Sequence, residues 1–576
     1  MRRLLSTTAL AAFGLLAAGT ALPAFAIDNY SPVTDARLTN PEPQNWLMTR
    51  GRYQGWSYSD LDQINTSNVK GLTPVWSISP GVDSGHEAPP IVNNGIMFIA
   101  TPYSQVMAVN AATGELLWRF KRKLPEGFSA LHNTSRGIAL YGDKVFLPAL
   151  DATLVALDAK TGKVAWEAKV EDWKTGYYMT AAPLIVKGKV MVGVAGGEFG
   201  VRGFVAAFDA DSGKPAWKTF TVPEPGQPGS ETWQKPDTWK HGGASTWMTG
   251  NYDPDSNTVY WGTGNGSPWF GDQRPGDNLY TSSTLALDPE TGKMKSYFQY
   301  HQNESWDWDE MNAPMVIDYQ KDGQTVKGLV KPARNGYLYW LQRGQDGAIS
   351  FDHAQPYVKQ NVFKSIDPKT GRPDVDPDHK PGTGKEATFC PSLWGGKDWP
   401  YESYNPRTGM VYVPSNDNHC GHLNGRVQEY VAGQWWTGVD IPEIGFTVDK
   451  NAAHYGEIQA FDVATGKKNW AALYPKSMMW GSVLSTAGNL VFAGGTNDRE
   501  FRAYDARTGD QLWQFKTNSG IIAPPSTFSV DGVQYVAVES GWGIDAAGQQ
   551  ALISNLLGWP KDVPQGGVVW VFAVQK

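Results

Sequence analysis

Four polar side chains of the sequence are of the types that bind a hard metal ion. Glu198, Asn265 and Asp307 each follow a strand-like run, in a setting rich in Gly or Trp. Hard cations take oxygen ligands of this kind. Asp309 follows Asp307 by two positions, and on an extended segment residues two apart point the same way. Each residue taken singly has another interpretation: Glu198 as a solvated loop acid, Asn265 as a turn former, and Asp309 as a structural acid paired with a basic neighbour.

A repeated phrase indicates which elements position these side chains. The phrase reads Ala-x-(Asp/Asn)-x-x-(Thr/Ser)-Gly, usually with Trp four residues later. Gly114, Gly162 and Gly213 at its centre lie 48 and 51 residues apart, while Gly466 and Gly509 lie 43 apart. A period of 40 to 50 residues with strands on each side is typical of propeller blades. Six near-copies argue against the alternative, which is a set of unrelated hairpins with similar turns.

The phrase encodes a strand, a tight turn and a second strand. Asp158 can accept turn amide hydrogens, and Gly162 supplies a backbone angle closed to most residues. The second strand then carries Trp166 into the layer between blades. The phrase is missing between Gly292 and Gly466, where strand-like runs such as 336–341 and 409–413 persist. We therefore predict an all-β, eight-bladed propeller over residues 27–576, with strand 567–574 closing the ring near the mature N-terminus.

The sequence resembles the quinoprotein methanol/ethanol dehydrogenase family across nearly the whole mature chain. Order and spacing match in eight stretches: GHEAPP at 85–90, TSRGIALYGDKVF at 134–146, GGEFGVRG at 196–203, GTGNGSPW at 262–269, ESWDWDEMNAP at 304–314, RNGYLYWL at 334–341, CPSLWGGKDW at 390–399 and WGSVLSTAGNLVFAGG at 480–495. The resemblance implies an eight-bladed propeller, bound PQQ with a metal beside it, and oxidation of a primary or secondary alcohol.

The resemblance also implies roles for the candidate residues. Glu198, Asn265 and Asp307 match the metal ligands. Asp307 is in addition the general base that takes the hydroxyl proton while hydride leaves for C5 of PQQ. The metal would polarise the C5 carbonyl, and Arg334 matches the arginine that bonds the quinone oxygens. Lanthanide-dependent members carry an acid at the position of Asp309. The resemblance therefore favours a lanthanide as the metal, with calcium as the alternative.

The cofactor positions of the family map onto a second set of residues. They are Glu87, Arg136, Thr180, Ala195, Gly196, Gly197, Trp247, Arg334, Asp398 and Trp480. Arg136 suits a PQQ carboxylate because its planar fork binds two oxygens. Trp247 would stack on the rings, with blade packing as the alternative.

Two positions depart from the family pattern. Ala130 and Leu131 replace a vicinal cysteine pair, so apolar side chains are expected to close the second face of the cofactor. Asp398 stands where Asn is usual, and an acid there repels the quinone oxygens unless it is protonated or paired with Lys397.

Substrate and electron acceptor are less sharply indicated. Segments around Trp394, 435–436 and 540–543 are candidates for the substrate pocket, and their aromatic density suggests a bulky or ring-bearing alcohol. The chain has no Cys-x-x-Cys-His, hence no covalently attached haem, so electrons are expected to leave through a separate soluble cytochrome c. The alternatives are a sugar, polyol or aldehyde dehydrogenase of the same family and a non-catalytic scaffold propeller. The oligomeric state stays open, a homodimer included.

The N-terminus and the cysteines indicate an exported protein. Arg2 and Arg3, an apolar run and Ala24-Phe25-Ala26 form a signal peptide over residues 1–26, which points to the periplasm. An uncleaved anchor is the alternative, although the run is short for a membrane span. Cys390 and Cys420 can pair in an oxidising compartment, as in relatives, or stay as buried thiols. The net charge of −7 gives no reason to expect a nucleic-acid partner.

Overall fold

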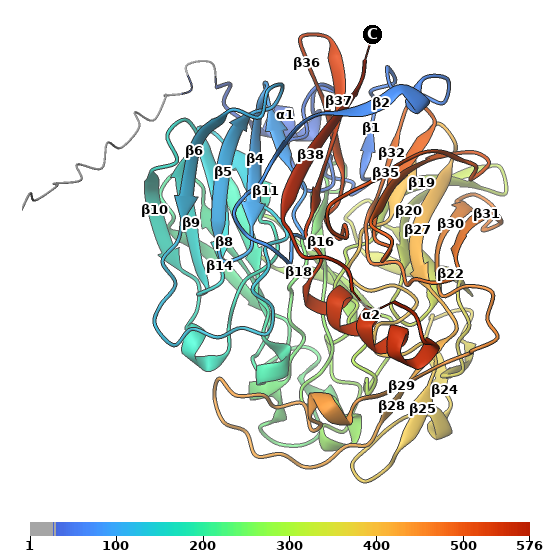
Figure 1. Cartoon of the computed structure of the whole chain (residues 1–576). Helices are drawn as coiled ribbons and strands as arrows, with labels where there is room; N and C mark the ends of the chain where they lie inside the picture. The colour runs from blue at the N-terminus through green and yellow to red at the C-terminus, as the bar shows by residue number, and fades with distance from the viewer. Residues whose placement is uncertain (1–26, 28–29, 561, 576) are drawn as a thin grey trace, which may run out of the picture.

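The computed structural model describes residues 27, 30–560 and 562–575, and it is mostly β-structure. The predicted signal peptide lies outside the described residues. Figure 1 shows the sheets standing side by side around a common centre, with helix α2 (Ile544–Leu557) and the inserted strands at one end and helix α1 (Asp35–Thr39) at the other. None of the helices in the described part of the chain is both long and apolar enough to cross a membrane.

The first half of the chain forms antiparallel sheets of four consecutive strands. They are β3 (Ile91–Asn93), β4 (Ile96–Thr101), β5 (Gln105–Asn110) and β6 (Leu116–Lys121); β7 (Ala139–Tyr141), β8 (Lys144–Ala149), β9 (Thr153–Asp158) and β10 (Val164–Lys169); β11 (Leu184–Val186), β12 (Lys189–Gly193), β13 (Phe204–Asp209) and β14 (Pro215–Phe220); β15 (Asn251–Asp253), β16 (Thr258–Gly262), β17 (Ser283–Leu287) and β18 (Met294–Gln299). Inner strands such as β4 are buried on both faces, whereas outer strands such as β6 carry buried and solvent-exposed side chains in turn.

The second half continues the pattern with strands from more distant segments. The sheets are β19 (Met315–Lys321), β20 (Gln324–Pro332), β21 (Tyr337–Arg343) and β22 (Ile349–Pro356); β26 (Ser403–Asn405), β27 (Met410–Asn416), β30 (Gly456–Asp462) and β31 (Lys468–Tyr474); β1 (Tyr58–Ser59), β32 (Val483–Thr486), β33 (Leu490–Ala493), β34 (Glu500–Asp505) and β35 (Gln511–Lys516). Two small sheets are insertions: β23 (Phe363–Ile366) with β24 (Pro373–Val375), and β25 (Ala387–Phe389) with β28 (His419–Leu423) and β29 (Gly445–Val448).

The chain ends meet in one sheet. β38 (Val568–Val574) lies between β2 (Leu72–Ile78) and β37 (Val533–Ser540), and β36 (Ser526–Val530) completes this sheet. Figure 1 shows the blue strand β2 beside the dark red β38. The expected pairing of the C-terminal strand with N-terminal strand material is therefore present, and it covers a sheet edge that would otherwise be open.

Tryptophans at the ends of the sheets dock most sheets on the next one. The Trp118 indole at the end of one sheet donates to the Ala159 carbonyl of the following turn at 2.9 Å. Gly162 allows this approach, since a Cβ there would lie 2.5 Å from the Trp118 ring. Trp76, Trp166, Trp217 and Trp470 repeat the contact, and the Trp513 indole donates to the Leu72 carbonyl of β2. Successive docked sheets that return to the first one form a β-propeller.

Candidate functional site

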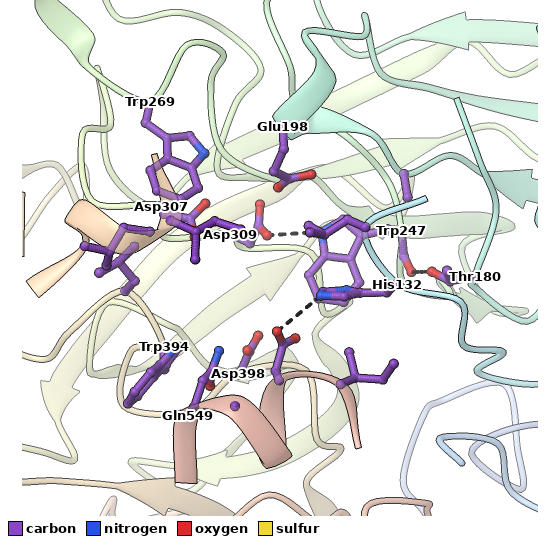
Figure 2. A pocket seen from close by; sticks show the side chains of 18 of the residues that line it. His132, Thr180, Glu198, Trp247, Trp269, Asp307, Asp309, Trp394, Asp398 and Gln549 are labelled. Atoms are coloured by element: carbon purple, nitrogen blue, oxygen red, sulfur yellow. Dashed lines mark hydrogen bonds and ion pairs between the residues drawn. The ribbon is translucent and has the colours of Figure 1, made fainter. Parts of the chain in front are cut away.

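A cavity of about 490 Å³ lies at the loop end of the propeller. Its walls come from loops that connect consecutive sheets, from loops within a sheet such as β12–β13 and β16–β17, from the insertion between β28 and β29, and from α2. Figure 2 shows Glu198 and Trp269 on one side of this cavity, with Trp394 and Gln549 on the other. Five carboxylates line it against two arginines: Glu198, Asp307, Asp309, Asp398 and Asp545 face Arg136 and Arg334. The excess of acidic groups indicates a site that takes up a cation.

Three of the four predicted metal ligands, Glu198, Asp307 and Asp309, line this cavity, and the fourth, the buried Asn265, contacts two of them from behind its wall. The Asn265 side-chain amide donates to Asp307 Oδ1 at 2.7 Å, and the Asn265 backbone amide donates to Asp309 Oδ1 at 2.6 Å. Glu198 faces the same space from the short 3-10 turn after β12 (Figure 2). The loops β12–β13, β16–β17 and β18–β19 position these groups, because all three open at the same end of their sheets.

The backbone around the acids differs from the extended segment that we predicted. Asp307 has a left-handed backbone with φ 62°, and the Asp309 amide donates to the Asp307 carbonyl at 3.2 Å. A tight turn, not a two-residue repeat on a strand, therefore brings both carboxylates to one cavity. Gly264 makes room for the second acid, since a Cβ at this position would lie 2.3 Å from Asp309 Oδ1.

The acids are poorly compensated by the protein alone. Burial, reinforced by the charge of Asp309, raises the pKa of Glu198 to about 7. Burial also raises the pKa of Asp307 well above its ordinary value, and Arg334 only partly opposes this shift. The buried Asn265 Oδ1 accepts no hydrogen bond. Three carboxylates and a free amide oxygen form a ligand set for a hard metal ion, so the residues present fit such an ion.

Arg334 is the cation that holds several of the acids. Its guanidinium lies 3.1 Å from Asp398, 3.3 Å from Asp309 and 3.8 Å from Asp307, and its Nε donates to the Leu393 carbonyl at 2.7 Å. Asp398 is therefore paired with Arg334. The pairing with Lys397 that we considered is absent, because the Lys397 ammonium lies 3.2 Å from Glu402 and donates only to the Asp398 backbone carbonyl.

An aromatic and cationic wall faces the acids. The Arg136 guanidinium lies over the Trp247 ring at 4.6 Å, donates to Thr180 Oγ1 at 2.6 Å and pairs with Glu87 at 2.9 Å. Arg136 Nε is buried without a hydrogen-bond partner. The Trp247 indole donates to Asp309 Oδ2 at 3.1 Å, which links this wall to the acids. A flat aromatic ring beside unsatisfied guanidinium donors suits a planar polycarboxylate such as PQQ.

The remaining predicted cofactor positions are divided. Ala195 and Gly196 line the cavity, while Gly197 lies behind it, where its carbonyl accepts from Ser267 Oγ at 2.5 Å. Trp480 is buried and outside the cavity wall, with its ring 5.7 Å from that of Trp394. Glu87 also lies behind the wall and reaches the site through Arg136.

Helix α2 is the part of the site that sequence reasoning missed. Its Asp545 lies 3.2 Å from His132 Nε2, and Asp545, Gln549 and Leu552 all line the cavity. Burial lowers the pKa of His132, but the Asp545 carboxylate outweighs burial and leaves the pKa above its ordinary value. The run of Ala, Gln and Leu from Asp545 to Gly558 carried a helix signal. Leu131, the residue before His132, lines the cavity as expected, whereas Ala130 does not line it and packs against the cluster of Leu150, Tyr178 and Ala195.

The insertions supply an apolar lid. Trp394 and Trp435, both expected near the substrate, line the cavity with Trp269, Ile441 and Phe446. The backbone of Trp436 is held next to that of Glu198, because the Trp436 amide donates to the Glu198 backbone carbonyl at 2.7 Å. Cys390 and Cys420 form the predicted disulfide, which fastens the segment before Trp394 to β28.

Comparison with known proteins identifies close relatives of this architecture. The family model for the β-propeller domain of PQQ glucose/ethanol/alcohol dehydrogenases matches residues 46–364 and 472–536. The quinoprotein alcohol dehydrogenase PedH of Pseudomonas putida is 39% identical, over 94% of this chain and 93% of its own. A quinoprotein ethanol dehydrogenase of Pseudomonas aeruginosa is 36% identical, over 89% and 88%. The structure of a europium-containing methanol dehydrogenase matches with TM-score 0.86 and 34% identity, over 94% of this chain and 99% of its own.

Proposed function

The chain belongs to the family of PQQ-dependent alcohol dehydrogenases with a β-propeller domain, and we propose that it oxidises a primary or secondary alcohol to the aldehyde or ketone. Membership of this enzyme family removes the alternative of a non-catalytic scaffold. The observation that carries the proposal is the position of Asp307, whose carboxylate lies in the same cavity as the Arg136–Trp247 wall. Oxidation of an alcohol requires a base for the hydroxyl proton beside the group that accepts the hydride.

PQQ and one metal ion are the cofactors of this family, and the residues present fit both. PQQ supplies a two-electron acceptor, and the metal supplies a Lewis acid that polarises its quinone. Trp247, Arg136 and Thr180 would hold the PQQ ring and its carboxylates, with Ala195 and Gly196 at its edge. Glu198, Asn265, Asp307 and Asp309 would hold the metal.

The protein's part in the reaction rests on Asp307 and Arg334. Asp307 Oδ1 accepts a hydrogen bond from Asn265, whereas Oδ2 lies 3.8 Å from Arg334, too far for a hydrogen bond. Oδ2 is thus the oxygen available to take the substrate hydroxyl proton. Arg334 holds the surrounding acids in place and presents a fixed positive charge where negative charge develops on reduction.

The lid favours an alcohol with an apolar or ring-bearing substituent. Trp269, Trp394, Trp435 and Phe446 give the cavity an aromatic wall, while Asp309 and Arg334 lie beside Asp307. Such a wall excludes water and orients the hydroxyl group toward the base. Sugars and polyols gain less here, because their additional hydroxyls would lose hydration against apolar side chains.

We favour a lanthanide as the metal. Asp309 places a third carboxylate beside Glu198 and Asp307, and three negative ligands match a trivalent ion better than Ca²⁺. Electrons would pass to a separate soluble cytochrome c, and the enzyme would work in the periplasm after cleavage near Ile27.

The propeller would have eight blades, which is supported by the seven four-stranded sheets and one five-stranded sheet of the described residues.

The first test is reconstitution of the metal-free chain with PQQ, titrated separately with Ca²⁺ and La³⁺. Dye-linked oxidation is measured for ethanol, 2-phenylethanol, an aldehyde and glucose. We expect La³⁺-dependent turnover, with the aromatic alcohol preferred. Activity with Ca²⁺ alone would make Asp309 a structural acid, and preference for glucose would favour the sugar dehydrogenase alternative. Failure to bind PQQ or to oxidise any of these compounds would contradict the proposal.

A further inference from the structure

A second group of ligand-type side chains lies away from the cavity, at the end of β27 and the start of β30. Asp417 follows β27 directly, His454 precedes β30 by two residues, and Glu457 is the second residue of β30. One ligand atom from each lies within 4.8 Å of the other two. None of the three lines the cavity of the proposed active site.

The imidazole of His454 is mostly buried, with its side chain 18% exposed. Both ring nitrogens are buried and have no hydrogen-bond partner, although one ligand atom of the ring lies within 4.8 Å of oxygen atoms from two carboxylates. Glu457 is 3% exposed, and its Oε1 accepts from the Gln459 side chain at 2.9 Å, which leaves Oε2 without a hydrogen bond. An unpaired buried polar atom costs free energy, so the two buried ring nitrogens of His454 call for a missing partner.

The spacing of these atoms distinguishes a shared ion from a direct ion pair. His454 Nε2 lies 3.6 Å from Glu457 Oε2, beyond hydrogen-bond distance. Two ligands bound to one tetrahedral zinc at about 2.0–2.1 Å lie roughly 3.4 Å apart. A protonated imidazole between two carboxylates would instead donate at about 2.7–2.9 Å. The observed gap is longer than a direct hydrogen bond and close to the separation of two ligands on one metal ion.

We propose that Asp417, His454 and Glu457 form a second metal site, for a zinc-class divalent ion, that is distinct from the acid cluster of the cavity. The imidazole selects Zn²⁺ and related transition ions over Ca²⁺, Mg²⁺ or a lanthanide, which take oxygen ligands only. Three protein ligands leave one position for water. The proposal does not depend on the reaction that the enzyme catalyses.

The backbone around the site is rigid enough to hold an ion. Asn416 pairs with Gly456 in the β27–β30 ladder, the Asp417 amide donates to the Tyr455 carbonyl at 2.8 Å, and the Asn418 side chain donates to the His454 carbonyl at 3.1 Å. The next strand along the chain, β28, carries Cys420 of the disulfide. An ion here would fasten the base of the insertion that closes the active-site cavity.

The test counts metal on the whole mature chain loaded with PQQ and saturated with La³⁺, so that the cavity site is filled. After incubation with Zn²⁺ and removal of excess, elemental analysis should find one Zn²⁺ per chain. His454→Gln and Asp417→Asn should each lose it, with Zn²⁺ affinity falling at least the roughly 10- to 100-fold that loss of an outer-shell partner costs. His353→Gln is the matched control, because His353 makes an ordinary 3.1 Å contact with a single carboxylate, Asp352.

Two further measurements keep the outcome clear. Co²⁺ in place of Zn²⁺ should give the visible absorption of a four- or five-coordinate ion in the wild-type chain and in His353→Gln. Asp417 is half-buried, so Asp417→Asn remains informative if His454→Gln does not fold. The proposal would be overturned if the wild-type chain retained no Zn²⁺, or if both site variants retained as much Zn²⁺ as the wild-type chain. Displacement of the Zn²⁺ by La³⁺ would also overturn it.

Discussion

The packed sheets of this propeller and its loop end are stabilised in opposite ways. Along the sheets, neutral contacts repeat: an indole of one sheet covers a turn glycine of the next, as Trp118 covers Gly162. At the loop end, five carboxylates and two arginines surround one cavity. Burial raises the pKa of Glu198 to about 7 and that of Asp307 well above its ordinary value. The sheets supply stability, and the loop end holds charges that are unfavourable until a cation binds.

This difference teaches where mutations should act. Substitutions at the loop end should change catalysis and metal affinity while leaving folding intact or improving it. Substitutions in the repeat should change the free energy of unfolding. The predictions below test this division, beginning with the largest effect.

Asp307→Asn should remove the base and lower kcat by about 100- to 10,000-fold, the range that general-base catalysis contributes. Unfolding of the metal-free variant should be no easier than that of the wild-type chain. Steady-state kinetics and thermal denaturation measure the two effects. Asp322→Asn is the matched control, because Asp322 also has positive φ but is exposed on a hairpin. A stable, fully active Asp307→Asn enzyme would break the comparison at its catalytic end.

Gly162→Ala should destabilise the fold by about 2–4 kcal/mol. Part of this is the left-handed backbone at φ 69°, and the rest is overlap with the Trp118 ring 2.5 Å from the new Cβ. Gly409→Ala is the matched control. It has the same cost of a left-handed backbone, since φ is 68°, but no overlap, because nothing lies within 4 Å of the added Cβ. The difference in urea-unfolding free energy between the two variants measures the docking contact. Equal losses would show that the indole contributes nothing.

Glu198→Gln should stabilise the metal-free chain by about 1–2 kcal/mol at pH 8, once solvent screening is allowed for. The pKa of Glu198 lies near 7 when folded, above its ordinary 4.5, so the wild-type chain loses stability as pH rises from 4.5 through 7. The variant should show a shallower fall over this window. Denaturation at several pH values measures it, and the same substitution should weaken metal binding. Identical pH profiles would contradict the unpaired state of this acid.

The smallest effect is expected at the bridge between His132 and Asp545. Both side chains are partly exposed, at 21% and 26%, so their coupling should stay below about 1 kcal/mol. A double-mutant cycle with His132→Asn and Asp545→Asn measures it. Quenching of tryptophan fluorescence by PQQ should show a rise in Kd of a few fold for each variant. A coupling above 2 kcal/mol would mean that this bridge, and not the sheets alone, stabilises the fold.

The fold was predictable because the repeat is local. The turn chemistry of Asp158 and Gly162 and the following Trp166 lie within nine residues, and the structure contains the corresponding strands and docking contacts. α2 escaped prediction because a single 14-residue helix interrupts an otherwise regular β-pattern. The partner of Asp398 also escaped prediction. We considered the adjacent Lys397, whereas the structure pairs Asp398 with Arg334, which lies 3.1 Å away but is distant in the sequence.

The sequence by itself predicted the repeated sheets, because the repeat depends on residue type and short-range spacing. The resemblance to the family supplied the roles of the acids, and the presence of only two cysteines limited any disulfide to one pair. Only the tertiary structure decided how the site is assembled. The left-handed turn at Asp307 aims two carboxylates at one cavity, and α2 closes that cavity through Asp545. The physical reason is that burial and the distances between charges arise when loops from separate sheets meet, and these quantities set the pKa values and the demand for a cation.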